Sequence, residues 1–557
     1  MHIPNDLDAT SWKQLEPFYS DLLQRELNSA SELEELLHDR SELDAAAEEA
    51  KSLAYIRMTC FTDDDEVSEA FLNIVQEVDP CLKKAQFDLD RKIVDSPAAG
   101  ELDAERYGIL LRELRARVGI YREENLELVA EDEALSQQYN SIIGAMSVEL
   151  DGETQTLQQA GLAFDGVDRE KRREAWVACA DRRLEDHEAL DELFDKLIAA
   201  RHQIALNAGF ANYMEYAFVD RSRFDYTPDD CKALHAAIAE LCVPLQLENL
   251  RERAEKLGLE VLLPWDLHVD PDGHKPLRPY SDSEELVAGT SQVFHRLDPE
   301  LGALFDTMRD GESLDLDSRA GKSAGGYQVM LQRSRKPFIF MNAAGTDDDL
   351  RTMVHEGGHA LHSMLCRDDP LLMYRDCCAE FCEVASMSME LLAQPYFDQF
   401  YDEVTAERAR KKQLQAIIKS LPFIAQIDAF QHWLYTNPVH THAERDAQWL
   451  ELDARFRPGV SWDGVTDAHS KEWHRVPHLF SYPFYMIEYA IAQLGALQLW
   501  TQSTSDEQRA LTNYKRALGL GGSRPLPELF EAAELEFDFS SKTVAGLMAA
   551  IQARLSD

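Results

Sequence analysis

Apolar residues at helical spacing run through the N-terminal part of the chain. Near residues 20–40 leucines recur near the helical period with acidic residues between them, namely Leu22, Leu23, Leu27, Leu33, Leu36 and Leu37. Such a period places apolar side chains on one face of a helix and charged side chains on the other. Proline and glycine interrupt the pattern at residues 94–100 and 161–166, where we expect helices to end. The pattern predicts an N-terminal part made almost entirely of helices.

The pattern changes in the middle of the chain. Residues 263–280 contain four prolines and predict a loop-rich crossing. Residues 327–331 and 337–342 are short apolar runs that predict two strands. A helical pattern begins directly after them, near Thr346, so we expect a small sheet at about residues 320–345 beside that helix. The glycines before the first strand lack the upstream glycine of a phosphate-binding loop, so no nucleotide site is expected.

Length, charge and cysteine content limit the functional classes. The 557 residues suffice for two lobes, and we expect a helical N-terminal lobe of residues 1–195 and a mostly helical region of residues 196–557. The 101 acidic residues outnumber the 56 basic ones, and such a surface repels nucleic acid and anionic membranes. No secretory signal or apolar run of about 18 residues is present. With nine irregularly spaced cysteines, this predicts a cytoplasmic protein.

The pattern H-E-x-x-H follows the two predicted strands in the sequence. Its defining residues are His355, Glu356 and His359. On a helix, two histidines four positions apart lie on the same face, where both can bind one metal ion, usually zinc. Glu356 follows the first histidine and projects near the same place. It can therefore take a proton from a metal-bound water.

The neighbouring residues also predict a helix here. Thr346 is a suitable N-cap, and the three aspartates that follow it place negative charge at the positive end of the helix dipole. Gly357 and Gly358 lower the helix propensity of the same segment. A pair of glycines inside a helix indicates that another part of the chain approaches closely.

A catalytic zinc ion needs a third protein ligand. Glu383 lies 28 positions after His355, in a segment of residues 376–390 that predicts a second helix. Glu380 lies one turn before Glu383 on the same face of that helix. Two histidines and one carboxylate leave a fourth position for water, as in catalytic rather than structural zinc sites. We therefore predict the metal ligands His355, His359 and Glu383.

Histidine and tyrosine gather at residues 473–490, where an otherwise apolar helical pattern begins that runs to about Trp500. The hydrogen-bond donors of interest are His478, Tyr482, Tyr485 and Tyr489. A packed aromatic cluster would explain part of this composition. The functional interpretation is a set of phenol and imidazole donors that face the metal from the opposite wall.

With these motifs, the chain resembles the oligoendopeptidase F and thimet oligopeptidase family of zinc peptidases, the oligoendopeptidase F branch more closely. The resemblance covers about residues 165–505. Residues 355–362 match the metal helix of the family, residues 383–387 match the segment with the third ligand, and residues 325–327 and 337–342 match the lead-in to the metal helix. Glu380 falls at the position of a supporting carboxylate, and His478 at that of the histidine facing bound substrate. The tyrosines do not align uniquely, so all three stay candidates for the oxyanion donor.

The resemblance implies a mainly α fold, a two-lobed helical body with a deep substrate channel and one Zn²⁺ per chain on the channel floor. It implies a zinc-dependent oligoendopeptidase that hydrolyses internal bonds of short peptides, with Glu356 as general base and Glu380 hydrogen-bonded to His359. An extended peptide can add to an edge of the small sheet, where Gly325 and Gly326 permit close approach before Tyr327 begins the strand. These three residues are the predicted substrate-binding residues.

Two other functions fit parts of the sequence. A zinc carboxypeptidase or dipeptidyl carboxypeptidase needs a cation for the terminal carboxylate of the substrate. Arg475 is a candidate, although a structural ion pair explains it better. A peptide-binding protein without activity would not need Glu356.

Some metal-binding side chains have no assigned role. The cysteines of the third-ligand segment allow a redox or second-metal interpretation, but packed free thiols explain them more simply; they are Cys377, Cys378 and Cys382. Three histidines have no carboxylate partner that the sequence identifies, namely His432, His440 and His442.

Overall fold

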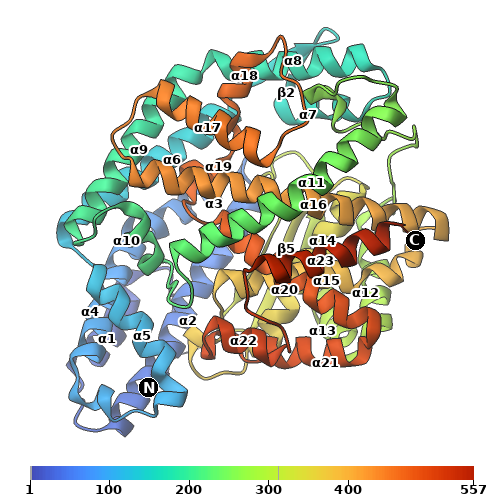
Figure 1. Cartoon of the computed structure of the whole chain (residues 1–557). Helices are drawn as coiled ribbons and strands as arrows, with labels where there is room; N and C mark the ends of the chain where they lie inside the picture. Colours follow the sequence, from blue (N-terminus) through green and yellow to red (C-terminus); the bar gives the residue numbers. More distant parts are fainter. Residues whose placement is uncertain (1–2, 5, 312, 557) are drawn as a thin grey trace. The chain divides into compact units, whose positions relative to one another are not determined.

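The computed structural model describes residues 3–4, 6–311 and 313–556, which are mostly helical (Figure 1). The predicted mainly α fold with a small sheet is confirmed. The chain divides into two compact units, each built from three separate segments: unit 1 contains residues 1–119, 277–410 and 492–537, and unit 2 contains residues 120–276, 411–491 and 538–557. The expected division into residues 1–195 and 196–557 stays a prediction, and its boundary lies inside a helix, α9 (His187–Asn207).

Unit 1 carries the small sheet and the predicted metal helix. Its helices are α1 (Trp12–Gln24), α2 (Ala30–Cys60), α3 (Asp65–Asn73), α4 (Asp79–Asp95), α5 (Ala104–Ile120), α12 (Ser283–Leu297), α13 (Pro299–Arg309), α14 (Asp347–Cys366), α15 (Ala379–Leu392), α21 (Glu507–Leu518) and α22 (Leu526–Ala532). Its strands are β3 (Leu314–Asp317), β4 (Tyr327–Leu331) and β5 (Lys336–Ala343). Leu22, Leu33 and Leu36 are fully buried in the core that α1, α2, α4 and α5 share, as the leucine spacing predicts.

Unit 2 contains the His–Tyr segment. Its helices are α6 (Leu126–Gly144), α7 (Leu157–Gly161), α8 (Arg169–Glu185), α9, α10 (Tyr213–Asp220), α11 (Pro228–Leu257), α17 (His442–Phe456), α18 (Thr466–Ser470), α19 (Pro477–Ser481) and α23 (Ser541–Ser556). Two long helices, α16 (Glu403–Thr436) and α20 (Met486–Ser505), cross the boundaries between the units in sequence. The predicted helix breaks are confirmed, because α4 ends at Asp95 and α7 ends at Gly161.

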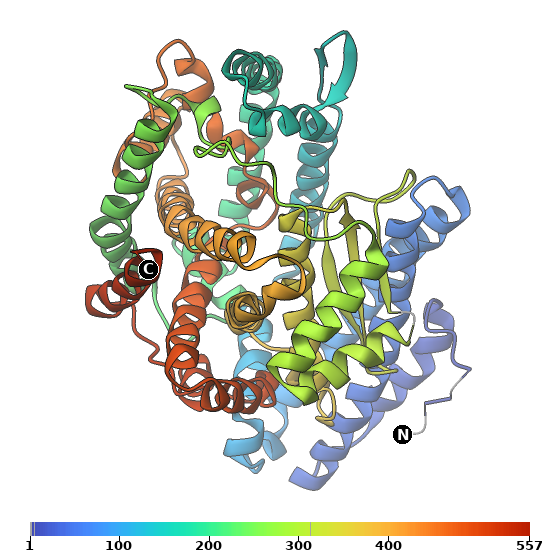
Figure 2. The ribbon, with the colours of Figure 1, turned by 90° about the vertical axis from the view of Figure 1, so that its right-hand side faces the viewer.

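The sheet of unit 1 has the strand order β3-β5-β4, with β3 parallel and β4 antiparallel to β5. Strands β4 and β5 confirm the two predicted runs, while β3 was not predicted because only Leu316 of its four residues is buried. One face of β4 and β5, with Tyr327 and Phe340, packs on Ile56 and Cys60 of α2. Figure 2 shows the sheet beside α2. Helix α14 packs against β4 and β5, so the sheet lies next to the metal helix as expected.

A β-hairpin interrupts the N-terminal part that we expected to be almost wholly helical. Strands β1 (Ser147–Leu150) and β2 (Glu153–Thr156) pair in antiparallel register around Asp151 and Gly152. Both turn residues have positive φ, 54° and 83°. Asp-Gly is the dipeptide that two-residue hairpin turns favour, because both central residues must adopt this conformation. The expectation was wrong here because it overlooked that turn.

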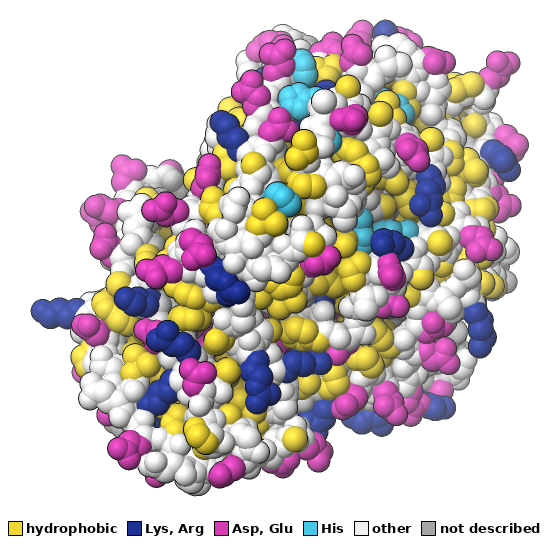
Figure 3. All heavy atoms as spheres, turned by 60° about the vertical axis from the view of Figure 1, so that its left-hand side comes forward, with side chains coloured by type: hydrophobic (Ala, Val, Ile, Leu, Met, Phe, Trp, Pro, Cys, Tyr) yellow, Lys and Arg dark blue, Asp and Glu magenta, His cyan; other side chains and the backbone are white. Residues whose placement is uncertain are grey.

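The surface is strongly acidic, in keeping with the formal charge of −45. On the face in Figure 3, Asp and Glu side chains are spread widely, and Lys and Arg lie singly or in small groups among them. Among the described residues, no helix combines the length and the apolar character needed to cross a bilayer.

Candidate metal centre

Helix α14 begins as its sequence predicts. Thr346 is the N-cap, and its hydroxyl accepts a hydrogen bond from the backbone N–H of Asp349, whose carboxylate accepts in return from the N–H of Thr346. Asp347 accepts hydrogen bonds from Tyr401 and Arg351. Two reciprocal bonds satisfy amides that a helix start leaves open. The start of the helix, and therefore the direction of its metal-binding face, is held by side chains.

Three predicted metal ligands converge in unit 1. The ligand atoms of His355, His359 and Glu383 all lie within 4.8 Å of one another. The Glu383 Oε2 atom is 3.4 Å from His355 Nε2 and 3.7 Å from His359 Nε2. Bonds of about 2.0–2.1 Å around tetrahedral zinc separate two ligand atoms by about 3.4 Å. The residues therefore fit a zinc ion, since both histidines present Nε2 at the required spacing.

A carboxylate that the motifs did not single out contacts the first predicted ligand, His355. His355 Nδ1 lies 2.7 Å from Glu390 Oε1, seven residues beyond Glu383 on α15. Burial opposes protonation of His355, but its contacts with Glu383 and Glu390 outweigh burial and raise its pKa well above the usual value. A carboxylate on the far nitrogen of a ligating histidine fixes the tautomer and orients the ring. The sequence feature that could have identified Glu390 is its two-turn spacing from Glu383, which places both carboxylates on the same face of α15.

The other two ligands have different partners. Burial and the neighbouring His355 lower the pKa of His359 to about 4, against a hydrogen bond with the backbone of Cys382. Ser386 donates a hydrogen bond to Glu383 Oε2 at 3.1 Å. Glu380 is buried on α15, 4% exposed, and its assignment to His359 stays a prediction.

Glu356 follows the predicted ligand His355 and contacts the sheet. Its side chain is largely buried, 8% exposed, and accepts a hydrogen bond from the backbone N–H of Gln328 in β4. Burial raises the pKa of Glu356 to about 7, with His355 opposing and Glu383 adding to the shift. A cation at the three ligands would lower this pKa again. Because the N–H of Gln328 points to Glu356 rather than to β5, the outer edge of β4 faces this carboxylate.

The two glycines of α14 mark close packing, as predicted. A Cβ on Gly358 would lie 2.7 Å from the Cα of Ser386 and 3.0 Å from the carbonyl oxygen of Ala385, both on α15. A Cβ on Gly357 would meet the ring of Phe294 at 2.9 Å. Glycine therefore lets the backbones of α14 and α15 approach closely enough to bring Glu383 to the two histidines.

The predicted substrate-binding residues lie at the start of β4: Gly325 and Gly326 precede the strand and Tyr327 is its first residue. Gly325 has a φ of +99°, which favours glycine, and a Cβ there would meet nothing within 4 Å. A Cβ on Gly326 would lie 3.3 Å from Thr352 of α14. The Tyr327 ring stacks on Phe340, and its hydroxyl bonds Thr59 at 2.7 Å. The side chain of Tyr327 thus holds the sheet against α2, and the role of the three residues toward substrate stays a prediction.

The predicted His–Tyr cluster forms in unit 2. The His478 ring lies 6.2, 5.9 and 6.0 Å from the rings of Tyr482, Tyr485 and Tyr489, measured between centroids. Tyr482 is the most open, 58% exposed. The guanidinium of Arg221 lies over the Tyr485 ring at 5.5 Å. The structure therefore brings all four predicted side chains together, and their action at the metal stays a prediction.

A strained turn positions this cluster. Phe484 has a φ of +64°, which is rare for a residue with a bulky side chain. Its N–H donates to Gln431 at 2.6 Å, and its carbonyl oxygen accepts from Arg223. Arg223 also pairs with Glu488 at 2.5 Å. Sequence reasoning did not single out Arg223, Gln431 or Glu488, which hold the chain between α19 and α20.

Several unassigned side chains have structural partners. Arg475 pairs with Glu472 at 2.9 Å, the ion pair that the sequence favoured. His442 lies 2.7 Å from Asp195, and His440 lies 2.6 Å from the Asn437 carbonyl oxygen. Cys377, Cys378 and Cys382 form no disulfide bond among the described residues.

The sequence matches the family description "Peptidase family M3" over residues 165–548, which is more than half of the chain. The chain belongs to peptidase family M3. The description "Peptidase M3 N-terminal domain" matches residues 6–120. The resemblance noted from the motifs is thereby confirmed, and the family match also extends to the N-terminal helices, which the motifs did not cover.

Relatives within the M3 family differ in how much of their length they share with the chain. The group B oligopeptidase PepB of Streptococcus agalactiae is 25% identical over 295 residues, 49% of this chain and 46% of PepB. An oligoendopeptidase F homolog of Borreliella burgdorferi is 22% identical over 75% of this chain and 71% of its own length. The chain thus matches about half the length of PepB, and less of some other relatives.

Solved structures match a larger share of the chain than these sequence relatives do. PZ peptidase A with an inhibitor has a TM-score of 0.91 and 28% identity, covering 98% of this chain and 97% of that chain. A protein from Bacillus anthracis str. Ames, described as an oligoendopeptidase F, has a TM-score of 0.87 and 26% identity, covering 99% and 97%. The M3 fold therefore extends over nearly the whole chain.

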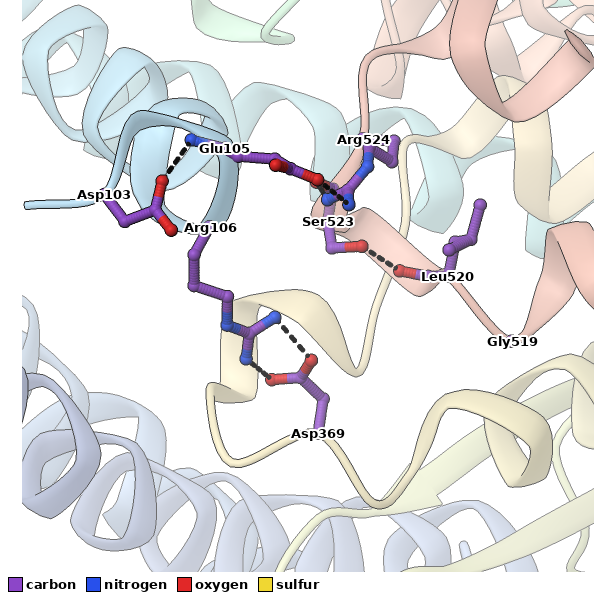
Figure 4. A pocket seen from close by; sticks show the side chains of 8 residues that line it. All are labelled: Asp103, Glu105, Arg106, Asp369, Gly519, Leu520, Ser523 and Arg524. Carbon is purple, nitrogen blue, oxygen red and sulfur yellow. Dashed lines mark hydrogen bonds and ion pairs between the residues drawn. The ribbon is translucent and has the colours of Figure 1, made fainter. Parts of the chain in front are cut away.

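This M3 family member also has a polar pocket of about 450 Å³ in unit 1, shown in Figure 4. Arg106 in the pocket forms a double hydrogen bond with Asp369, at 2.9 and 2.6 Å. Arg524 pairs with Glu105 at 3.5 Å. None of the metal-site residues lines the pocket. Because both arginines already contact carboxylates, the pocket offers no open anion site.

Proposed function

We propose that the chain is a zinc-dependent oligoendopeptidase that hydrolyses internal bonds of short, unstructured peptides. The observation that carries this proposal is the convergence of two Nε2 atoms and one carboxylate oxygen within 4.8 Å, with Glu356 next to them. Membership of peptidase family M3 supports the peptidase class.

Zinc, when bound by His355, His359 and Glu383, supplies a Lewis acid and lowers the pKa of a water to about 7. Glu356 is the general base of the proposal: it accepts the proton from the attacking water and passes it to the leaving amine. The bond from Gln328 orients its carboxylate. Glu390 keeps His355 in the tautomer that presents Nε2.

Substrate is proposed to bind as an added strand on the outer edge of β4. The Gln328 N–H points away from β5 and toward Glu356, so a peptide on this edge passes the proposed base. Backbone hydrogen bonds bind extended peptides with little regard to sequence. A folded protein would first have to unfold, at a cost of about 5–15 kcal/mol.

The donor for the oxyanion is proposed to come from the His–Tyr cluster, with His478 facing substrate and Tyr485 as the first candidate. Tyr482 and Tyr489 are the alternatives. This assignment rests on the family resemblance and on the clustering of the four side chains in unit 2. The cytoplasmic location and the absence of nucleic-acid and membrane partners also stay predictions.

A pair of variants tests the proposed centre. Glu356→Gln should retain zinc and lose turnover, since it removes the base without changing a ligand. Glu383→Ala should lose zinc affinity itself, because two histidines bind the ion poorly. Zinc content and cleavage of a fluorogenic peptide are measured on the same preparations. A Glu356→Gln variant with near-normal turnover contradicts the mechanism, and an undiminished zinc affinity in Glu383→Ala contradicts the ligand set.

Mass spectrometry of a mixed peptide library tests the mode of cleavage. Internal cuts support the endopeptidase, and stepwise loss from the C-terminus would establish a carboxypeptidase instead. A length series of one unstructured sequence then tests the size preference through kcat/KM. A rate that stays flat up to a full denatured chain would contradict a preference for short peptides.

A further inference from the structure

A second group of metal-binding side chains lies in the core of unit 2. Cys231, Asp428 and His432 are buried, and one ligand atom from each lies within 4.8 Å of the other two. A fourth side chain, His235, contacts the same carboxylate: its Nε2 is 2.8 Å from Asp428 Oδ2. The His235 and His432 rings stand nearly perpendicular, 5.6 Å apart. All four side chains belong to unit 2.

The helices explain why these four residues meet. Cys231 and His235 are four positions apart in the first turns of α11, which begins after the N-cap Thr227. Asp428 and His432 are four positions apart on α16. Each pair therefore lies on one face of its helix. Two such pairs on facing helices are the way in which helical bundles build metal sites in their cores.

Part of this cluster has no hydrogen-bond partner among the described residues. Asp428 is fully buried, and its Oδ1 atom is unpaired. Neither ring nitrogen of His432 makes a hydrogen bond of acceptable geometry, although Nε2 lies 3.2 Å from Asp428 Oδ2. An unpaired polar atom in a protein core destabilises the folded state, and a buried carboxylate needs a compensating charge. The hydrogen bond from His235 to Asp428 Oδ2 leaves the Oδ1 atom unpaired, and by itself it does not also supply the compensating charge.

We propose that Cys231, Asp428 and His432 form a second, structural metal site that binds a divalent cation of the zinc type, with His235 supporting the Asp428 carboxylate. One thiolate and one carboxylate neutralise the two charges of Zn²⁺, and the neutral imidazole of His432 is the third ligand, so the group is uncharged in the core. All three ligands are buried in the core of unit 2, and the bond from His235 would hold the Asp428 carboxylate toward the ion. On binding, the thiol of Cys231 releases its proton to solvent.

The proposed ion would join α11 to α16 and so stabilise unit 2. It would also orient His432, whose ring lies 5.7 Å from that of Phe484 in the strained turn. The site is distinct from the catalytic centre, which contains no sulfur ligand. That difference supplies a selective spectroscopic signal, because thiolate-to-cobalt charge transfer absorbs in the near ultraviolet and carboxylate or imidazole ligation does not.

Metal counting and cobalt substitution test the proposal in the full chain. Zn²⁺-loaded wild type should contain about two equivalents, and Glu383→Ala and Cys231→Ala about one each. The Co²⁺-loaded wild type should show the thiolate band, and Cys231→Ala and Asp428→Asn should lose it. Cys242→Ala is the matched control, since Cys242 is another fully buried cysteine of α11: it should keep both equivalents and the band.

The wild-type measurements decide the question even where a variant fails to fold. One equivalent of zinc with no thiolate band would overturn the proposal and leave a hydrogen-bonded Asp–His–His network. Two equivalents that persist in Cys231→Ala would place the second ion elsewhere and also overturn it. In the Glu383→Ala background, a chelator should lower Tm, because an ion that binds the native state stabilises it. Adding Cys231→Ala should abolish that shift.

Discussion

Gly358→Ala tests the close packing that brings the third ligand to the two histidines. The added methyl group would lie 2.7 Å from the Cα of Ser386, where ordinary contacts begin at 3.4 Å. The atom it meets belongs to the backbone of α15, so no side-chain rotation relieves the overlap. The backbone at Ser386 must move by about 0.7 Å, and Glu383 lies on the same helix one turn earlier.

The size of the effect follows from two opposing contributions. Overpacking a core costs about 1–3 kcal/mol, and a backbone clash belongs at the upper end of this range. Replacing glycine by alanine inside a helix stabilises the folded state by about 0.5–1 kcal/mol. We therefore expect a net destabilisation of about 2 kcal/mol. Metal sites tolerate distance errors of about 0.2 Å, so a shift of about 0.7 Å should also weaken zinc binding, by about 10–100-fold.

The measurements are the zinc dissociation constant, from competition with a chromogenic chelator, and denaturant unfolding of the metal-free protein. Gly108→Ala is the matched control, because Gly108 lies within α5 and a Cβ there would meet nothing within 4 Å. It should stabilise the protein by about 0.5–1 kcal/mol and leave zinc affinity unchanged. The effects of Gly357→Ala on stability and zinc affinity should lie between those of Gly358→Ala and Gly108→Ala, since its added methyl group meets only the ring of Phe294. Equal effects of Gly358→Ala and Gly108→Ala, or an unchanged zinc affinity in Gly358→Ala, would refute the argument.

Three further substitutions test other parts of the structure. Glu390→Ala should weaken zinc binding by about 10–100-fold while leaving all ligands in place; an unchanged affinity would show that the carboxylate behind His355 is dispensable. Tyr485→Phe should lower kcat about 100-fold with little change in KM, and a large effect of Tyr482→Phe instead would move the donor to that residue. The third concerns pH: burial raises the pKa of Glu472, but two arginines outweigh it and lower the pKa to about 2. A lowered carboxylate pKa adds stability above the unfolded value of about 4.3 that is lost as the pH falls toward 2. Denaturant unfolding should therefore show Glu472→Gln about 3 kcal/mol less stable than wild type at pH 7, with the difference shrinking below about pH 4; a constant difference would contradict the ion-pair explanation.

Local periodicity made much of unit 1 predictable. Four-residue spacing alone puts His355 and His359 on one face of a helix, and the cap at Thr346 sets where that helix begins. Sequence also predicted the apolar strands β4 and β5 and the leucine-rich helices α1 and α2, because burial on one face imposes a period on the sequence. The hairpin at Asp151 and Gly152 was also encoded locally and was overlooked.

Relations between distant helices were not readable from the chain. Glu390 reaches His355 only because α14 and α15 pack closely at Gly358, and their approach depends on backbone contacts that have no sequence period. The arginines that hold the Phe484 turn come from more than 250 residues earlier in the chain. Likewise, Cys231 and His432 are ordinary buried residues of two separate helices until α11 and α16 face each other. The sequence by itself determined which side chains share one face of one element, since that follows from backbone geometry. Only the tertiary structure decided which faces meet, because that depends on the packing of the whole core.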